Sequence, residues 1–239
     1  MIDFHTHILP AIDDGSSNVE ESIKLLKMLE EQGVRKVVLT PHFYAYSSSA
    51  ESFVRRRQSA LNDLVAAVCD AGIGIDIYLG CEVLYFEELW RLENLENYCI
   101  EGTRYILVEM PFDSWADSMI DGIEKIMAKG FIPIIAHFER YLGYKGNKGK
   151  VEKLVSIGAL LQMNCECLNH FLSRGKAIKY IKKGYVSALG TDCHNTESRA
   201  PEYATANDYL KKKLSSERYA HFHKRQQRIL ESAEKVRII

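Results

Sequence analysis

Histidine and carboxylate residues recur along this chain at positions suited to metal binding. The first of them are His5 and His7, which are separated by one residue. In a β-strand, successive side chains alternate between two faces, so these two imidazoles are expected to point the same way. Two imidazoles directed at one point provide part of a metal site, and the remaining ligands must come from other segments. Without such partners, the pair is equally typical of an ordinary strand end.

The same residue types follow the other strands that the apolar pattern predicts. Six of the seven predicted strands end in a histidine or a carboxylate. The carboxyl ends of parallel strands are where α/β barrels carry their active sites. Solvent-exposed charges would have no reason to keep to these positions. The candidate metal ligands are His5, His7, Asp14, His42, Glu82, Glu109, His137, Asp192 and His194.

This set of nine ligands is too large for one ion, which takes about four to six. It predicts a cluster of two or three divalent ions, because crowded carboxylates repel one another unless cations neutralise them. Mixed imidazole and carboxylate ligands suit Mn, Fe or Zn rather than Ca. Asp192 and His194 are again separated by one residue, so we expect them to repeat the geometry of the first histidine pair at another strand. Asp14 alternatively caps the turn into the first helix, and Asp13 is then the ligand.

Two arginines flank the proposed cluster. Arg140 follows His137 by three residues and Arg199 follows His194 by five. Arginine is a poor metal ligand but a preferred partner of phosphate, so we predict that both are catalytic. The alternative is a salt bridge to a nearby acid. Cys193 and Arg199 also fit the Cys-x5-Arg pattern of thiol phosphatases, but the loop between them has no glycine and contains an acid, so we interpret Cys193 as a core residue.

Short apolar strands alternate with amphipathic helices along the chain, which predicts parallel strands joined by helical crossovers. We expect one domain over 1–239, folded as a seven-stranded α/β barrel, with an open doubly wound sheet as the alternative. Two charged helices are expected over about 202–236. The predicted strands are 2–9, 36–40, 75–83, 105–109, 132–136, 160–164 and 185–190, and the predicted helices between them are 18–32, 52–71, 115–129, 151–157 and 177–183.

The composition excludes several other classes of protein. The 31 Lys and Arg nearly balance the 32 Asp and Glu, for a net charge of -1, so a nucleic-acid-binding protein, which needs a basic surplus, is not expected. No apolar run approaches the ~20 residues of a membrane span, and no signal peptide is recognisable. The six cysteines form no disulfide or zinc pattern. We therefore expect a cytoplasmic protein with reduced thiols and no membrane insertion.

With these residues identified, the chain resembles the PHP (polymerase and histidinol phosphatase) superfamily. It is most similar to the manganese-dependent tyrosine-protein phosphatases of bacterial capsule and exopolysaccharide loci. This resemblance implies a distorted, TIM-like (β/α)7 barrel, a trinuclear manganese site and arginines that hold phosphate. It also implies a phosphotyrosyl protein substrate, the tail of an autophosphorylated bacterial tyrosine kinase. The segments that carry the resemblance are 1–10, 13–15, 40–42, 80–82, Glu109, 136–140, and 191–194 with Arg199.

The leading functional hypothesis is metal-assisted hydrolysis of phosphotyrosine in proteins, with a role in exopolysaccharide or capsule synthesis. A histidinol phosphatase, or another small phosphomonoesterase, is the nearest alternative. An amidohydrolase also begins with His-x-His, but those enzymes typically use a modified lysine where this chain has Glu109. A metal-binding regulatory module without turnover is the alternative from another class. The tyrosines of the loop 43–49 are expected either to contact a substrate ring or simply to pack.

Overall fold

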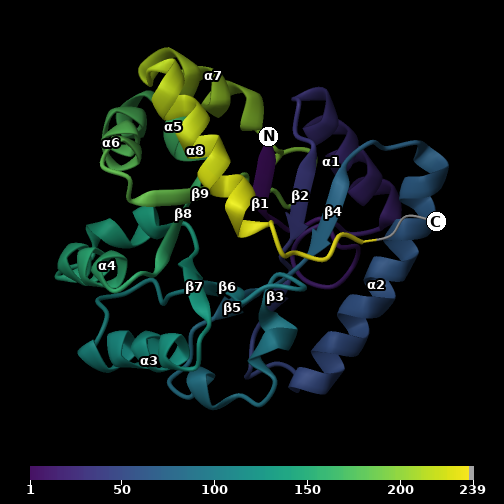
Figure 1. Cartoon of the computed structure of the whole chain (residues 1–239). Helices are drawn as coiled ribbons and strands as arrows, with labels where there is room; N and C mark the ends of the chain where they lie inside the picture. The colour runs from purple at the N-terminus through teal and green to yellow at the C-terminus, as the bar shows by residue number, and fades with distance from the viewer. Residues whose placement is uncertain (237–239) are drawn as a thin grey trace.

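The computed structural model describes residues 1–236, so the last three residues of the predicted domain lie outside the described part. Parallel strands form the centre, and helices surround them (Figure 1). The strands are β1 (Ile2–Thr6), β2 (Lys36–Leu39), β3 (His42–Phe43), β4 (Asp76–Leu79), β5 (Glu82–Leu84), β6 (Tyr105–Glu109), β7 (Ile132–Ile135), β8 (Leu160–Asn164) and β9 (Val186–Gly190). The α-helices are α1 (Val19–Glu31), α2 (Ala50–Ala71), α3 (Asp117–Ala128), α4 (Asn147–Ser156), α5 (Glu166–Asn169), α6 (Phe171–Lys182), α7 (Tyr203–Lys213) and α8 (Ser216–Ile229).

The predicted strand 75–83 is interrupted, and a short further strand, β3, follows the end of the predicted strand 36–40, which gives nine segments. Pro41 lies between β2 and β3, where its missing N–H breaks the hydrogen-bond ladder. Gly80 and Cys81 lie between β4 and β5 at the corresponding place in the next strand. The segments pair in two parallel sheets, β1-β2-β4 and β3-β5-β6-β7-β8-β9. The two sheets continue each other through these interruptions.

The last strand returns to the first. Asp192 N donates to His5 O at 2.8 Å and His7 N donates to Cys193 O at 2.9 Å. The ladder is not continuous around the described strands, but the sequential order and this seam confirm the distorted (β/α)7 barrel. The doubly wound alternative is wrong, because such a sheet would keep its first and last strands apart. The first strand, expected over 2–9, ends at Thr6, because the loop after it folds back and Ser16 N donates to His7 O.

Apolar side chains form two cores, one between the strands and the surrounding helices and one inside the barrel. The inner core contains Phe4 of β1, Leu107 of β6 and Ala188 of β9. Ile229 and Leu230, at the end of α8, pack against the same cluster. The C-terminal helix therefore fills the barrel interior from the end opposite to the predicted site.

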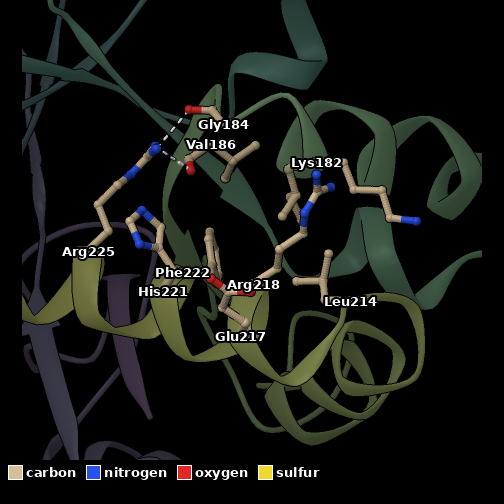
Figure 2. A pocket seen from close by; sticks show the side chains of 10 residues that line it. Lys182, Gly184, Val186, Leu214, Glu217, Arg218, His221, Phe222 and Arg225 are labelled. Carbon is tan, nitrogen blue, oxygen red and sulfur yellow. Dashed lines mark hydrogen bonds between the residues drawn. The ribbon is translucent and has the colours of Figure 1, made fainter.

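Helix α8 is held there by polar contacts with the start of β9. The Arg225 guanidinium donates to Gly184 O at 2.8 Å and to Val186 O at 2.6 Å (Figure 2). Further along, Val236 N donates to Ile77 O at 2.8 Å. These contacts extend the C-terminal segment across the amino ends of the strands. Within residues 1–236, no helix has both the length and the apolar character needed to cross a bilayer.

Candidate functional site

His5 of β1 and His7, which follows the strand directly, converge as predicted, with their Nε2 atoms 3.1 Å apart. Their position depends on an irregularity in the strand. The register of β1 against β2 shifts between Asp3 and Thr6, where β1 has one extra residue. A β-bulge of this kind redirects side chains. It brings His5 to the barrel interior that Phe4 already occupies, and both imidazoles point to the carboxyl end of the strands.

Glu82 is the carboxylate around which the histidines gather. Its Oε2 atom lies 3.0 Å from His5 Nε2, 3.4 Å from His7 Nε2 and 3.1 Å from His42 Nδ1. Its Oε1 atom lies 3.0 Å from His137 Nε2. The first residue of β5, Glu82 is almost fully buried. One carboxylate thus faces four imidazoles from three other strand ends.

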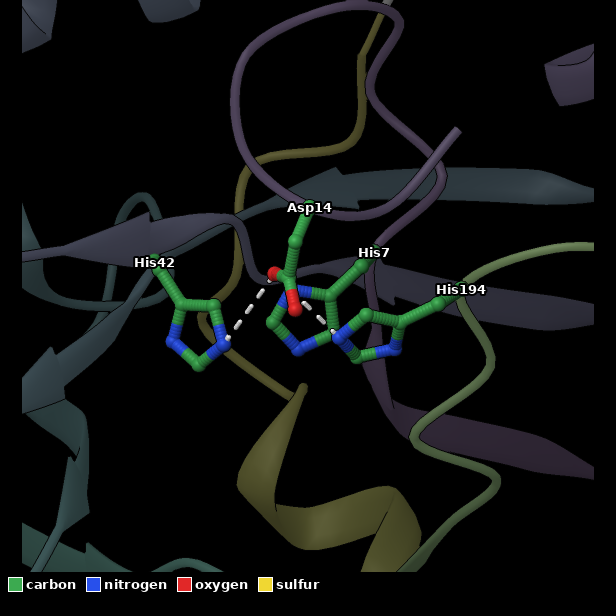
Figure 3. Close-up of side chains that lie close together, drawn as sticks. All are labelled: His7, Asp14, His42 and His194. Carbon is green, nitrogen blue, oxygen red and sulfur yellow. Dashed lines mark ion pairs between the residues drawn. The ribbon is translucent and has the colours of Figure 1, made fainter. Parts of the chain in front are cut away.

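A second group surrounds Asp14 at the mouth of the barrel (Figure 3). Asp14 Oδ1 lies 3.6 Å from His42 Nε2 and 3.5 Å from His194 Nε2. The neighbouring Asp13 turns inward, where it accepts hydrogen bonds from His7 Nδ1 at 2.8 Å and from His42 N at 2.9 Å. The geometry therefore favours Asp14 as the ligand and gives Asp13 the task of orienting His7.

Asp192 and His194 lie beyond the end of a strand, so strand alternation does not explain why their side chains point into the site. Strand β9 ends at Gly190, and Asp192 adopts φ +56°. His137 also has a positive φ of +27°. Such conformations strain residues that have a Cβ, and the surrounding structure must enforce them. The expectation that this pair repeats the geometry of His5 and His7 is therefore wrong, although both side chains still join the cluster.

Burial and pairing set the charge of these groups. Burial would lower the pKa of His7, but hydrogen bonds with Asp13 and Glu82 outweigh it and raise the pKa to about 10. Burial would likewise lower the pKa of His137, but its hydrogen bonds with Glu109 and Glu82 outweigh burial and raise the pKa to about 9. At Glu82, burial favours the neutral acid, but the surrounding histidines hold its pKa well below the usual range. These directions pair an ionised Glu82 with protonated His7 and His137, and a divalent ion bound by the two histidines would displace those protons.

The donor set fits divalent metal ions. Three overlapping groups have ligand atoms within 4.8 Å of one another. Three buried atoms of the cluster, namely His42 Nδ1, His194 Nε2 and Glu82 Oε2, lie 3.0–3.5 Å from ionisable partners but make no contact of hydrogen-bond geometry within the described residues. Unsatisfied buried nitrogen and oxygen atoms are costly unless a ligand pairs with them. The three groups are His7, Asp14, His42 and His194; His5, His7 and Asp192; and His42, Glu82 and Glu109.

Both predicted arginines lie at the edge of the cluster, and both pair with Asp192. Arg140 Nη2 lies 2.9 Å from Asp192 Oδ2, and Arg199 Nη2 lies 2.8 Å from Asp192 Oδ1. The predicted alternative of a salt bridge is thus present in the structure. The two side chains nevertheless stay 35% and 38% exposed, and both line a cavity of about 310 Å³ beside the cluster. A ligand in that cavity would meet both guanidinium groups.

Some residues that hold the site were not predicted. Gln162 Oε1 accepts from His137 N at 2.7 Å and lies 3.1 Å from His5 Nδ1. Asn164 Nδ2 donates to Asp192 Oδ2 at 2.9 Å. Both come from β8, the strand whose end has no histidine or acid. The sequence did contain one signal for them: Gln162 and Asn164 are separated by one residue, as His5 and His7 are.

The thiol of Cys193 does not take part in the site. It is buried, and burial raises its pKa far above the usual range, which disfavours the nucleophilic thiolate. All six cysteines, which lie within the described residues, are free. The interpretation of Cys193 as a core residue agrees with this environment.

Comparison with known proteins gives the chain a family. Residues 1–231 match the family model described as capsular polysaccharide synthesis, CpsB/CapC. The tyrosine-protein phosphatase CpsB of Streptococcus pneumoniae is 31% identical over 91% of this chain and 93% of its own length. YwqE of Bacillus subtilis, also named a tyrosine-protein phosphatase, is 28% identical over 91% of this chain and 86% of its own.

The fold matches that of solved relatives as well. A crystal structure from work on B. subtilis YwqE and S. pneumoniae CpsB, described as unique metal-dependent tyrosine phosphatases, superimposes with a TM-score of 0.86. It is 26% identical in sequence, and the match covers 99% of this chain and 97% of that chain. The strand-end ligands, the barrel and these matches lead to one assignment: the chain belongs to the CpsB/CapC family of capsular polysaccharide synthesis proteins.

Proposed function

We propose that this protein is a metal-dependent protein-tyrosine phosphatase acting in the cytoplasm on phosphotyrosyl proteins of capsule or exopolysaccharide synthesis. The observation that carries the proposal is the meeting of a buried histidine–carboxylate cluster with two partly exposed arginines at one cavity. The relatives, which are named tyrosine-protein phosphatases, support the same reaction. The tail of a bacterial tyrosine kinase is the substrate that we propose.

The nine predicted ligands would hold two or three divalent ions, with Mn preferred and Fe or Zn as alternatives. When bound, such ions supply Lewis-acid catalysis of phosphoester hydrolysis. His7 is shared between two of the three ligand groups, and so is His42. Through these shared ligands the residues would hold neighbouring ions, whose combined charge would attract a phosphate monoester.

Arg140 and Arg199 would bind the phosphoryl oxygens. Each now neutralises Asp192, and a metal ion on Asp192 would replace that interaction. The planar guanidinium groups would then be available for the phosphate, whose charge they stabilise during transfer. In this scheme the carboxylate holds both arginines in place until the site is loaded.

Aromatic side chains on the other side of the cluster would support the tyrosine ring. Tyr44 stacks on His42 with ring centroids 4.8 Å apart, and Tyr46 stacks on Tyr44 at 5.5 Å. Tyr46 is 79% exposed. A cavity of about 570 Å³ lies beside Asp14, His42 and Tyr44. Offset stacking of this kind favours an aryl phosphate over an alkyl phosphate.

The decisive experiment compares hydrolysis of a phosphotyrosyl peptide with that of histidinol phosphate, each with Mn²⁺ and with a chelator. We expect metal-dependent turnover with a higher kcat/KM for the peptide. A preference for histidinol phosphate would assign the protein to small phosphomonoesters. No turnover of either compound by metal-loaded protein would instead favour a regulatory metal-binding module.

A further inference from the structure

Helix α6 has an outward face made of one leucine and several lysines. Leu172, Lys176, Lys179 and Lys183, the residue directly after the helix, are all exposed. Their spacing of four, three and four residues puts them along one side of a helix. The opposite side is buried. Helix α6 contains no acidic residue, and the lysines that form ion pairs within the described part of the chain are Lys150, Lys153 and Lys235.

The start of α6 exposes two large apolar side chains next to each other. Phe171 is 77% exposed and Leu172 is 95% exposed. A single exposed apolar residue is ordinary, but an adjacent pair beside a row of lysines is the composition of a segment that lies at a membrane interface. The exposure of Phe171 and Leu172 indicates a contact with another apolar surface, because burying side chains of this size is favourable.

The basic surface continues onto α7. The Arg174 guanidinium lies 4.8 Å from the ring centroid of Phe171 and 5.2 Å from that of Tyr209, and the Lys213 ammonium lies 5.7 Å from Tyr209. These contacts connect the start of α6 with the three exposed lysines that end α7. Residues 171–228 contain 13 Lys and Arg but only 5 Asp and Glu, although the whole chain has a net charge of -1.

The same charge extends to the other end of α6. Lys182, Arg218, His221 and Arg225 line a cavity of about 340 Å³ between α6 and α8 (Figure 2). Helices α6 and α7 lie at one side of the barrel, α8 runs from α7 across the barrel, and α2 lies on the opposite side (Figure 1). The basic residues of α6 thus continue, through this cavity, onto the start of α8.

We propose that this α6 face, formed by Phe171, Leu172, Lys176, Lys179 and Lys183, docks the protein on an anionic phospholipid membrane. Phe171 and Leu172 enter the interface, and the lysines lie over the headgroups. Each lysine near such a surface adds attraction that does not require a fixed geometry. A protein partner would need a shaped surface with oriented hydrogen bonds, whereas this face is the convex side of a helix with flexible ammonium groups.

Docking in this way would place the proposed active site next to the bilayer. Helix α6 follows β8, whose last residue Asn164 contacts Asp192 of the cluster. His170, the residue before Phe171, lines the same cavity as Arg140 and Arg199. The cavity would thus open beside the membrane surface, where it meets membrane-tethered substrates. The docking itself does not rest on the proposed function.

The test is sedimentation of the full-length protein with vesicles at physiological salt. One set is phosphatidylcholine alone, and the other contains phosphatidylcholine and phosphatidylglycerol in equal amounts. We expect the protein to bind only the anionic vesicles. The double variant Lys176→Glu/Lys179→Glu should bind them at least about tenfold more weakly, because each lysine contributes a several-fold factor. Phe171→Ser/Leu172→Ser should also weaken binding.

The matched control is Lys24→Glu/Lys27→Glu, two exposed lysines with the same spacing on α1. It changes the net charge equally and should keep vesicle binding. Circular dichroism and hydrolysis of p-nitrophenyl phosphate check that each variant is folded. Equal binding to neutral and anionic vesicles, or an equal loss in the α1 control, overturns the proposal. Absence of vesicle binding together with lysine-dependent binding of polyglutamate would identify an acidic protein partner and would also overturn it.

Discussion

The replacement Gln162→Leu isolates the contribution of the residues that hold the ligands. Gln162 is fully buried, and its amide makes three contacts, with His137 N at 2.7 Å, His5 Nδ1 at 3.1 Å and Asn164 Oδ1 at 2.8 Å. Leucine has a similar size but leaves these groups without a partner. Each buried group left unsatisfied costs about 1–3 kcal/mol, so the three groups together predict a loss of about 3–9 kcal/mol in the free energy of unfolding.

The same change should weaken metal binding, because His5 and His137 lose the contact that orients them. Loss of such a supporting contact typically lowers metal affinity about 10–100-fold. Urea unfolding of metal-free protein gives the first quantity, and competition of Mn²⁺ with a fluorescent chelator gives the second. Both effects are expected in one variant.

Gln226→Leu is the matched control. Gln226 is also a fully buried glutamine, but its single contact, from Leu189 N, is long at 3.5 Å, and its Nε2 atom has no partner among the described residues. This change should leave Mn²⁺ affinity unaltered and cost less stability. Wild-type Mn²⁺ affinity in Gln162→Leu, or an equal loss in both variants, would refute the supporting role of Gln162.

The remaining predictions concern catalysis and pH. Arg199→Ala should lower kcat/KM for a phosphotyrosyl peptide at least about 100-fold, since one preorganised donor to transition-state charge contributes that much; a change of only a few fold would contradict the phosphate-binding role. Cys193→Ser should keep its activity while a chelator abolishes that of the wild type, and the reverse pattern would restore the thiol mechanism. Burial lowers the pKa of His223 to about 4, below its unfolded value of about 6.5, so stability should fall as pH drops through this window. Between about pH 7 and pH 5, the free energy of unfolding should fall by about 1 kcal/mol less in His223→Gln than in the wild type, after allowance for the partly exposed ring. Urea titrations of both proteins at the two pH values measure this difference. An equal fall in both proteins would contradict the assignment.

The sequence predicted the parts of the site that depend on chain periodicity. The spacing of His5 and His7 and the recurrence of acids at strand ends follow from rules that act within a few residues. The capping of α1 is of the same kind, because Asn18 Oδ1 accepts from Glu21 N, three residues along the chain, at 2.9 Å. Such features are readable because their causes are local.

The parts that were missed depend on tertiary contacts. The positive φ of Asp192 arises where β9 meets β1, and no local rule signals it. Gly190 is needed there because a Cβ atom would lie 2.4 Å from His5 Cβ, a contact between opposite ends of the chain. The pairing of both arginines with one aspartate likewise depends on three loops meeting. Sequence spacing alone could not have indicated these contacts.

The seam between β1 and β9 has a consequence for how the protein folds. About three-quarters of the chain separates β1 from β9, its neighbour across the seam. Ile229 and Leu230, which complete the inner core, lie still further along the chain. Contacts so distant in sequence slow folding, because the entropy of closing a long loop precedes the gain from packing. During synthesis, one edge of β1 therefore stays unpaired, and His5 and His7 stay without their partners from the later strands, until β9 and α8 have left the ribosome. The histidine–carboxylate cluster is then among the last features that the nascent chain acquires.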